Sequence, residues 1–279
     1  MKPVKKKPAK KKLMDYLLAA LLIYLLVMAL TFFIQRSFMY FPDTARQDPA
    51  LFQASNMDII NVTTADGLSL QGWYQAPQDQ EKPVIVFFHG NGSHMGLSAL
   101  KTSQMRAQGY GAMLIAYRGY AGNEGKPSEK GLYKDARAFI DWVINEQNIP
   151  QERLVLYGES LGSGVAVEMA VNDYPDIAGV ILEAPYTSFI EMARRTHFWL
   201  PLDLLMRDRY ETIDKIANVK APILVLHGKR DMIVPYRFGK EVFEAAPEPK
   251  IMKTYKEAGH NDQFMHGASD DILTWLDTL

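Results

Sequence analysis

Five short hydrophobic runs limit the possible folds of this chain more than any other feature of its sequence. Each run is uninterrupted and at most five residues long, and together they occupy residues 84–88, 112–116, 154–157, 180–182 and 223–226. Strands that are hydrophobic throughout are typical of parallel sheets, because such sheets are buried on both faces. Amphipathic stretches with apolar residues at helical spacing lie between the runs, as at residues 130–147 and 164–172. This alternation predicts an α/β fold with a mostly parallel sheet that is covered by helices on both faces.

The sheet is predicted to begin with an antiparallel hairpin and to end with a strand at residues 251–255. Residues 58–63 and 68–75 are rich in side chains that favour strands, and they flank the turn signal Ala65-Asp66-Gly67. Between residues 55 and 279 the sequence has no internal repeat, low-complexity tract or linker. We therefore expect residues 55–279 to form one domain.

A run without charged residues near the N-terminus predicts a transmembrane helix. Residues 16–34 are nineteen positions without a charge, which is long enough for a helix to cross roughly 30 Å of hydrocarbon. The run is longer than the hydrophobic part of a signal peptide, which is about 7–15 residues, and no small-residue cleavage site follows it. We predict a basic tail at residues 1–12, an uncleaved transmembrane helix at 13–35 and a connecting segment at 36–54.

The distribution of charge predicts the orientation of this helix and excludes one class of partner. Seven lysines lie in the first twelve positions, whereas only Arg36 and Arg46 follow the helix within a dozen residues. The positive-inside rule therefore predicts a cytoplasmic N-terminus and an extracytoplasmic folded domain. Once these seven lysines are set aside, 24 of the 31 basic residues remain against 32 acidic ones. A chain with this balance lacks the basic surface that nucleic-acid binding requires.

A serine flanked by glycines stands directly after one predicted strand. Residues 158–162 read Gly-Glu-Ser-Leu-Gly, a match to G-x-S-x-G, and a helical pattern begins immediately after them. A serine on so tight a strand-to-helix turn needs small residues two positions away on either side. Its hydroxyl then projects from the sheet, and the N-terminus of the helix offers amide dipoles to developing negative charge. Ser160 is therefore the predicted nucleophile.

Two further residues fit the partners that a nucleophilic serine needs. A serine hydroxyl is weakly nucleophilic near neutral pH, so it requires a histidine base and a carboxylate that orients the base. Asp231 follows the predicted strand at residues 223–226, and His260 follows the last predicted strand. The carboxyl ends of parallel strands are where open α/β sheets build their sites. Ser160, Asp231 and His260 are the predicted catalytic residues, with separations of 71 and 29 residues.

Other acidic residues and histidines fit these roles less well. Glu183 also follows a predicted strand and remains an alternative acid, although its expected role is a hydrogen bond that holds a loop. Asp262 lies too close to His260 in sequence, so we expect it to cap or pair locally. The other histidines lack metal-ligand spacing, and the chain has no cysteine, so we expect no metal or organic cofactor. We expect a structural role for His227, and we expect the histidines at positions 94, 197 and 266 (His94, His197 and His266) to lie in loops or on the surface.

A glycine-rich turn after the first buried strand is the predicted oxyanion hole. Residues 89–92 read His-Gly-Asn-Gly, and such a turn allows backbone amides to approach a substrate oxygen. One amide is expected from Leu161, directly after the nucleophile, and the second from Asn91, with Gly92 as the alternative. Each donor that is aimed at the oxyanion lowers the barrier by ~3 kcal/mol.

These motifs together resemble the α/β-hydrolase superfamily of serine hydrolases over nearly all of residues 55–279. The resemblance rests on residues 89–92, on 117–120 with Gly122, Gly125 and Pro127, and on 158–162, 183–188, 227–231 and 259–262. The order serine, aspartate, histidine is also the order of that family. The sequence looks most similar to single-pass, membrane-anchored α/β-hydrolase-domain proteins related to serine aminopeptidase-like and depalmitoylating hydrolases. One departure is Ala121, where the family usually has glycine.

The resemblance implies the α/β-hydrolase fold and an esterase, thioesterase or lipase activity. Residues 186–216 offer the only room for a cap over the site, and they are rich in aromatic, aliphatic and arginine side chains. We expect a membrane-anchored serine hydrolase that cleaves carboxylic esters, including lipid esters and thioesters, through a Ser-His-Asp triad and an acyl-enzyme. The expected partners are a small-molecule or lipid ester and the membrane. A membrane-bound serine peptidase and a non-catalytic, membrane-anchored scaffold are the alternatives.

Overall fold

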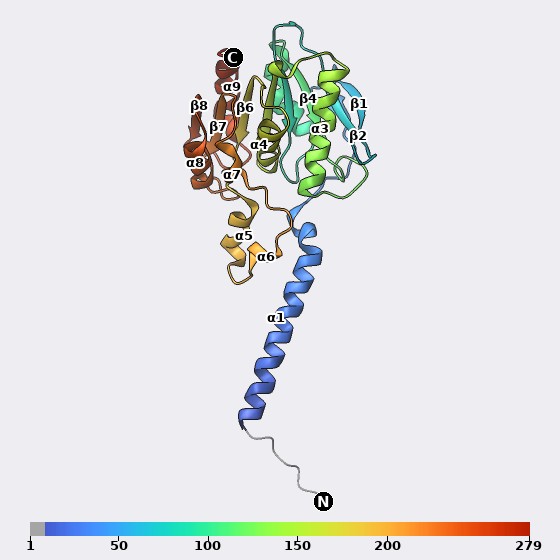
Figure 1. Cartoon of the computed structure of the whole chain (residues 1–279). Helices are drawn as coiled ribbons and strands as arrows, with labels where there is room; N and C mark the ends of the chain where they lie inside the picture. Colours follow the sequence, from blue (N-terminus) through green and yellow to red (C-terminus); the bar gives the residue numbers. More distant parts are fainter. Residues whose placement is uncertain (1–8) are drawn as a thin grey trace, which may run out of the picture.

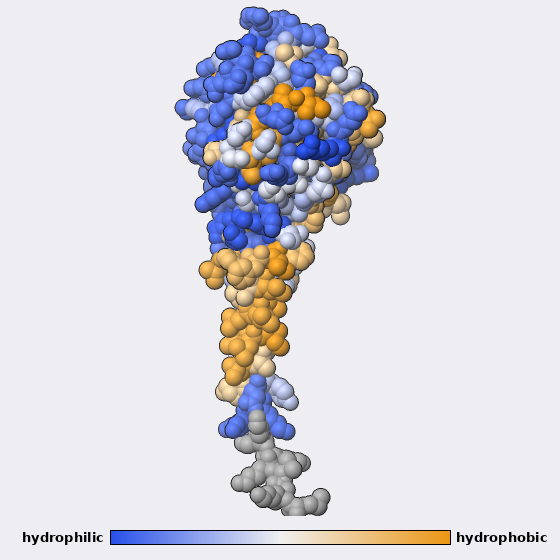
Figure 2. Space-filling model, turned by 90° about the vertical axis from the view of Figure 1, so that its right-hand side faces the viewer, coloured by the Kyte–Doolittle hydropathy of each residue, from blue (hydrophilic) through white to orange (hydrophobic). Residues whose placement is uncertain are grey.

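The described part of the chain begins with a long helix that projects from the rest of the molecule. The computed structural model describes residues 9–279, so residues 1–8 of the predicted basic tail lie outside the described residues. Helix α1 (Ala9–Met39) leaves the folded body as a stalk (Figure 1). It is long and apolar enough to cross a membrane, and its most hydrophobic stretch is not buried inside the protein. Figure 2 shows a hydrophobic surface along α1 that gives way to a largely polar surface on the body.

Helix α1 extends beyond both ends of the predicted helix at residues 13–35. At its start, the lysines at positions 10–12 are good helix formers and continue the helix towards the N-terminus. At its end, tertiary contacts hold the last turn. Gln35 Nε2 donates to the carbonyl of Leu205 at 3.0 Å, and Arg36 Nε donates to Asp208 Oδ2 at 2.7 Å.

One sheet organises the body. Within residues 9–279 it has eight strands in the order β1-β2-β4-β3-β5-β6-β7-β8. Strand β2 pairs antiparallel with β1 and with β4, and the other neighbours pair in parallel. The mostly parallel sheet and its leading antiparallel hairpin are therefore confirmed. The strands are β1 (Asp58–Thr63), β2 (Ser69–Gln75), β3 (Val84–Phe88), β4 (Gly111–Ile115), β5 (Leu154–Glu159), β6 (Gly179–Glu183), β7 (Ile223–Gly228) and β8 (Lys250–Tyr255).

Helices connect the parallel strands and cover both faces of the sheet, as the alternating pattern predicts. The α-helices after α1 are α2 (Met95–Ala107), α3 (Glu129–Asn145), α4 (Leu161–Asn172), α5 (Phe189–His197), α6 (Leu202–Leu205), α7 (Thr212–Ile216), α8 (Tyr236–Ala245) and α9 (Ala268–Leu276). Short 3₁₀ turns are η1 (Pro49–Phe52), η2 (Gln151–Arg153) and η3 (Gln263–His266). Helices α5 to α7 lie within the predicted cap, and α5 and α6 lie beside the upper end of α1 in Figure 1.

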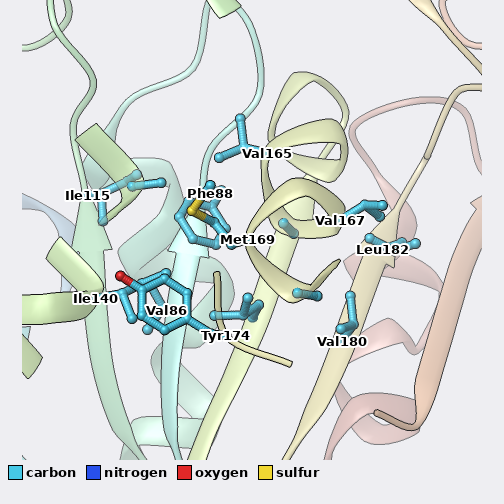
Figure 3. Packing of buried hydrophobic residues seen from close by; sticks show 14 of the residues in the cluster. Val86, Phe88, Ile115, Ile140, Val165, Val167, Met169, Tyr174, Val180 and Leu182 are labelled. Atoms are coloured by element: carbon cyan, nitrogen blue, oxygen red, sulfur yellow. The ribbon is translucent and has the colours of Figure 1, made fainter. Parts of the chain in front are cut away.

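Successive side chains of the buried strands enter two different cores. Val86 and Phe88 of β3 belong to the core under α3 and α4, whereas Ile85 and Phe87 belong to the core under α2 and α9. Figure 3 shows Phe88 beside Met169 of α4 in the first of these cores. This two-sided burial explains why the strands read as continuous hydrophobic runs. It also fixes the sheet rigidly, so the loops after β3, β5, β7 and β8 have a stable base.

Candidate active site

Ser160 occupies a strained turn between strand β5 and helix α4. Its backbone has φ 49° and ψ −112°, a conformation that residues other than glycine rarely adopt. Such a conformation costs about 1–3 kcal/mol and persists only where the surroundings enforce it. Here the Ser160 amide donates to the carbonyl of Glu183 at the end of β6, at 2.8 Å. The turn therefore directs the serine side chain away from both the strand and the helix.

The two glycines of the motif allow the helix to return close to the strand. A Cβ atom at Gly158 would lie 2.4 Å from the carbonyl oxygen of Gly162. A Cβ atom at Gly162 would lie 2.0 Å from the carbonyl oxygen of Phe88 in β3. Both obstacles are backbone atoms, which cannot move aside as a flexible side chain can. The spacing of the motif is thus a steric requirement of this turn.

Ser160, His260 and Asp231 form a continuous chain of hydrogen bonds. His260 Nε2 lies 3.1 Å from Ser160 Oγ, and His260 Nδ1 lies 2.7 Å from Asp231 Oδ2. Because the aspartate oxygen can only accept, Nδ1 carries the proton and Nε2 is left to accept from the serine hydroxyl. The three residues predicted from separate parts of the sequence lie together at the carboxyl edge of the sheet.

Asp231 is held in place as an ionised carboxylate. Its Oδ1 accepts the backbone amides of Ile233 and Val234, each at 2.8 Å, while Oδ2 faces His260. Burial opposes its negative charge, but hydrogen bonds from His227 and His260 outweigh burial and hold the pKa of Asp231 well below its usual range. His227 is fully buried and its Nε2 lies 3.0 Å from the carbonyl oxygen of Val234. His227 thus supports the loop that carries the aspartate.

The two alternative acids lie in other environments. Glu183 accepts hydrogen bonds from Lys101 and Tyr157, so its carboxylate is engaged away from His260. Asp262 Oδ1 accepts the backbone amide of Gly259 at 2.7 Å and closes the turn that presents His260. Both arrangements agree with the structural roles expected for these residues.

A half-buried lysine between two glutamates is the main feature that the sequence reading missed. Lys101 Nζ lies 2.9 Å from Glu159 Oε1 and 2.7 Å from Glu183 Oε1. Burial opposes the charge of Lys101, but the two carboxylates raise its pKa above the ordinary value, while burial raises the pKa of Glu183. The network fixes the residue directly before Ser160. A signal was present, because positions 98, 101 and 105 share one face of a helix and the outer two are buried.

The predicted oxyanion loop and the predicted nucleophile line one cavity. Leu161 is the first residue of α4, so its amide has no acceptor within the helix. Asn91 and Gly92 line the same cavity, and no acceptor for either amide is found within residues 9–279. The Asn91 side chain is also fully engaged, since Oδ1 accepts from the Phe41 amide and the Tyr120 hydroxyl and Nδ2 donates to the Met39 carbonyl. The loop is thereby tied to the end of α1.

His89 stabilises the same loop from below. Its ring is completely buried against Tyr117 and Tyr120, and its Nδ1 lies 2.8 Å from the carbonyl oxygen of Gly90. Burial lowers the pKa of His89 to about 4, so the ring is neutral near neutral pH and donates from Nδ1. The remaining histidines lie apart: His94 caps α2, and His197 and His266 are on the surface. Within the described residues, no three potential ligands are grouped to hold a metal ion.

The cavity in front of Ser160 is large and mainly hydrophobic. Its volume is about 900 Å³, within the range of small-molecule sites. Its walls come from the oxyanion loop, the histidine loop, the end of α1 and one face of α5. The apolar side chains that line it include Phe38, Phe41, Leu97, Phe189, Met192, Ile233 and Met265. A ligand with a hydrocarbon part would bury it against these walls.

Comparison with known proteins identifies the family. A family model described as serine aminopeptidase, S33 matches residues 79–206. The lysophosphatidylserine lipase ABHD12 of Danio rerio is 30% identical over 213 residues, which are 69% of this chain and 53% of that protein. The protein Rv2307c of Mycobacterium tuberculosis is 37% identical over 230 residues, which are 82% of this chain and 81% of the relative. The chain belongs to the α/β-hydrolase family.

This α/β-hydrolase also shares its fold with solved esterases. The Pyrococcus furiosus esterase Pf2001 superposes with a TM-score of 0.67 at 16% identity, over 86% of this chain and 96% of the esterase. The likeness extends to almost the whole body outside α1. The predicted α/β-hydrolase fold and the resemblance on which it rested are therefore confirmed.

The close approach at Gly162 predicts a large loss of stability on a minimal substitution. Gly162→Ala should lower the free energy of unfolding by about 3 kcal/mol or more, because the added methyl group meets a backbone oxygen. Gly259→Ala is the matched control, since the atom nearest to its Cβ would be 3.6 Å away. Chemical unfolding of the detergent-solubilised protein measures both. Equal stability of the two variants would contradict the steric account.

The ion cluster of Lys101, Glu159 and Glu183 predicts a loss of stability on substitution that depends on pH. Lys101→Met should cost about 3–5 kcal/mol near pH 8, because it leaves Glu159 and Glu183 buried without a cation. Their pKa values then rise in the folded state, so the deficit should shrink towards about pH 5, where the folded protein takes up protons. Lys134→Met, which breaks an exposed pair with Asp66, should cost at most about 1 kcal/mol. A deficit of Lys101→Met that is independent of pH would argue against an ionic origin.

Proposed function

We propose that this α/β-hydrolase is a serine hydrolase that cleaves carboxylic esters through an acyl-enzyme, with lipid esters and thioesters within its range. The observation that carries the proposal is the hydrogen-bonded chain from Ser160 through His260 to Asp231, which opens on a mainly hydrophobic cavity. A relative of this chain is a lysophosphatidylserine lipase and a structural neighbour is an esterase, which agrees with ester chemistry.

In the acylation step, His260 Nε2 takes the proton of the Ser160 hydroxyl as Oγ attacks the carbonyl carbon. The negative charge that develops on the carbonyl oxygen receives hydrogen bonds from the amides of Leu161 and Asn91. Asp231 stabilises the imidazolium that forms and keeps its Nδ1 proton facing the carboxylate. The imidazolium then donates its Nε2 proton to the leaving alkoxide or thiolate, and the acyl group remains on Ser160.

In the deacylation step, water takes the place of the leaving group. His260 removes a proton from the water, and the resulting hydroxide attacks the acyl-enzyme through the same oxyanion hole. Collapse of the tetrahedral intermediate returns the proton to Ser160 Oγ and releases the carboxylic acid. These steps use only side chains and amides of this chain.

The proposal includes anchorage by α1, with the N-terminus in the cytoplasm and the body outside it. The supporting observation is the excess of lysine before the helix. In this arrangement residues 1–12 are a cytoplasmic tail, residues 13–35 cross the membrane, residues 36–54 connect, and residues 55–279 are the catalytic domain. The ester substrates are then those on the outer side of the membrane.

A peptidase is the second candidate, favoured by the description of the matching family model and by Glu159. Glu159 lines the cavity beside Ser160, and its carboxylate pairs with Lys101 at 2.9 Å. A carboxylate oxygen in that position suits the ammonium group of a peptide N-terminus. The hydrophobic walls of the cavity favour the ester hydrolase.

The triad predicts separate effects for its members. Ser160→Ala should abolish turnover and labelling by a fluorophosphonate probe, because the attacking oxygen is missing. Asp231→Asn should lower kcat by about ten-thousand-fold, because an amide presents the wrong histidine tautomer. Gel fluorescence of the labelled full chain and steady-state kinetics check both. If the folded wild-type protein is not labelled, the alternative of a non-catalytic, membrane-anchored scaffold is supported instead. A fully active Ser160→Ala variant would refute the assigned nucleophile.

The ester-hydrolase and peptidase proposals predict different ratios of kcat/KM for an ester and an anilide substrate. We expect kcat/KM for p-nitrophenyl butyrate to exceed that for leucine p-nitroanilide, and Glu159→Gln to affect the anilide more than the ester. The two chromogenic substrates release products that are followed in the same spectrophotometer. Faster anilide turnover that depends on Glu159 would favour the peptidase.

A further inference from the structure

The cap, residues 186–216, contacts α1 at several successive levels along the helix. The Trp199 carbonyl accepts from the Tyr24 hydroxyl at 3.2 Å. Higher up, the Leu205 carbonyl accepts from Gln35, and Arg36 binds Asp208. The cap therefore runs alongside the upper part of the helix, with its lowest point near Trp199. We call residues 197–204 the cap tip.

The cap tip lies below the level at which the uncharged run of α1 ends. Met28 packs against the cap cluster formed by Ile190, Leu200, Leu202 and Leu205. With a rise of 1.5 Å per residue, Met28 is about 9 Å below Ile34. If Ile34 marks the edge of the hydrocarbon, the cap tip reaches about 9 Å below that edge at the level of Met28 and about 15 Å at the level of Tyr24. Amphipathic segments that lie in a membrane interface are buried by about 5–10 Å, so the cap tip is deep enough to contact acyl chains.

The exposed side chains of the cap tip suit that position. Phe198 is 83% exposed, Leu204 is 76% exposed and Trp199 is 50% exposed. Tryptophan is enriched at the boundary between hydrocarbon and headgroups. Among the charged residues nearby, Arg194 binds both Glu191 and Asp203, and Arg195 donates to the carbonyl of Ile233. The pairing of Arg194 with these two carboxylates lowers the free-energy cost of holding the three charges at a membrane boundary.

The wall of the active-site cavity leads to the same place. Phe189, Met192, Ala193 and Thr196 line the cavity that contains Ser160, and their spacing places them on one face of α5. Helix α5 ends at His197, directly before the exposed Phe198 and Trp199. On the opposite side, Phe38 at the end of α1 lines the cavity and is itself largely exposed. The cavity thus lies between two elements that descend towards the membrane.

We propose that the cap tip is a second membrane contact beside α1, and that the cavity opens at the membrane surface to take esters that reside in the bilayer. This inference rests on the proposed ester hydrolysis for its substrate, but the membrane contact itself does not. The partner is the lipid bilayer that α1 crosses, because the cap tip is continuous with the apolar surface of that helix. An ester with a long acyl chain would enter beside α5 without leaving hydrocarbon.

Tryptophan fluorescence tests the membrane contact without requiring activity. Of the four tryptophans, Trp73 and Trp275 are buried and Trp142 is half-buried in α3, whereas Trp199 is exposed at the cap tip. The full chain in phosphatidylcholine vesicles should lose fluorescence when one acyl chain of the lipid is brominated. Trp199→Phe keeps the backbone bond to Tyr24 and should reduce that loss by at least half. Equal quenching with and without Trp199 would overturn the contact.

Substrate presentation tests the opening. The variant Phe198→Glu/Leu204→Glu places carboxylates where hydrocarbon is expected, and neither residue lines the cavity. We expect the ratio of activity on vesicle-bound p-nitrophenyl palmitate to activity on soluble p-nitrophenyl butyrate to fall at least ten-fold. Ile59→Glu, at an exposed apolar position of the edge strand β1, should leave the ratio unchanged.

The fluorescence and activity measurements show separately whether the membrane contact, the opening of the cavity or the proposed ester hydrolysis fails. An unchanged ratio in the cap-tip variant would overturn the opening at the membrane. A wild-type protein that hydrolyses neither ester would refute the proposed function and, with it, the lipid-ester substrate. The fluorescence result then still decides the membrane contact.

Discussion

The turn at Ser160 is the constraint on which the site depends. Strand β5, the serine and helix α4 can meet at this angle only because Gly158 and Gly162 leave no Cβ atom between backbones that nearly touch. The strain at Ser160 is balanced by the hydrogen bond from its amide to the Glu183 carbonyl and by the dense core under α4. Glu183 continues this support through Lys101 to Glu159. The nucleophile is therefore positioned by packing on both sides of the sheet.

A second constraint joins helix α1 to the body. The bond between Arg36 and Asp208 connects the end of α1 to the cap, where the Asp208 side chain is almost fully buried. Tyr40 reinforces this junction through its hydroxyl, which contacts both Asp208 and Tyr210. A helix attached only by a flexible linker would leave the orientation of the body free. Here the orientation is set by short polar contacts and by the packing of Met28.

The sequence predicted most of the fold and pointed to three side chains that the structure brings within hydrogen-bonding distance, because both follow local rules. Hydrophobic runs reveal strands buried on two faces, and a G-x-S-x-G turn reveals where a serine is exposed. It did not predict Lys101, since a lysine in a helix is expected to face water. It also placed the end of the first helix too early, because contacts with Leu205 and Asp208, about 170 residues away, stabilise the last turn. Interactions across such distances leave no periodic pattern in the sequence.

The side chain of Asn91 changes how the N-terminal helix should be regarded. Its amide group donates to the carbonyl of Met39 and accepts from the amide of Phe41, while the residue lines the cavity beside Ser160. Helix α1 and the loop at residues 89–92 are thus mechanically coupled. A fragment that lacks α1 would lose the hydrogen bond from Asn91 to the Met39 carbonyl, and a lateral force on α1 would be transmitted to this loop.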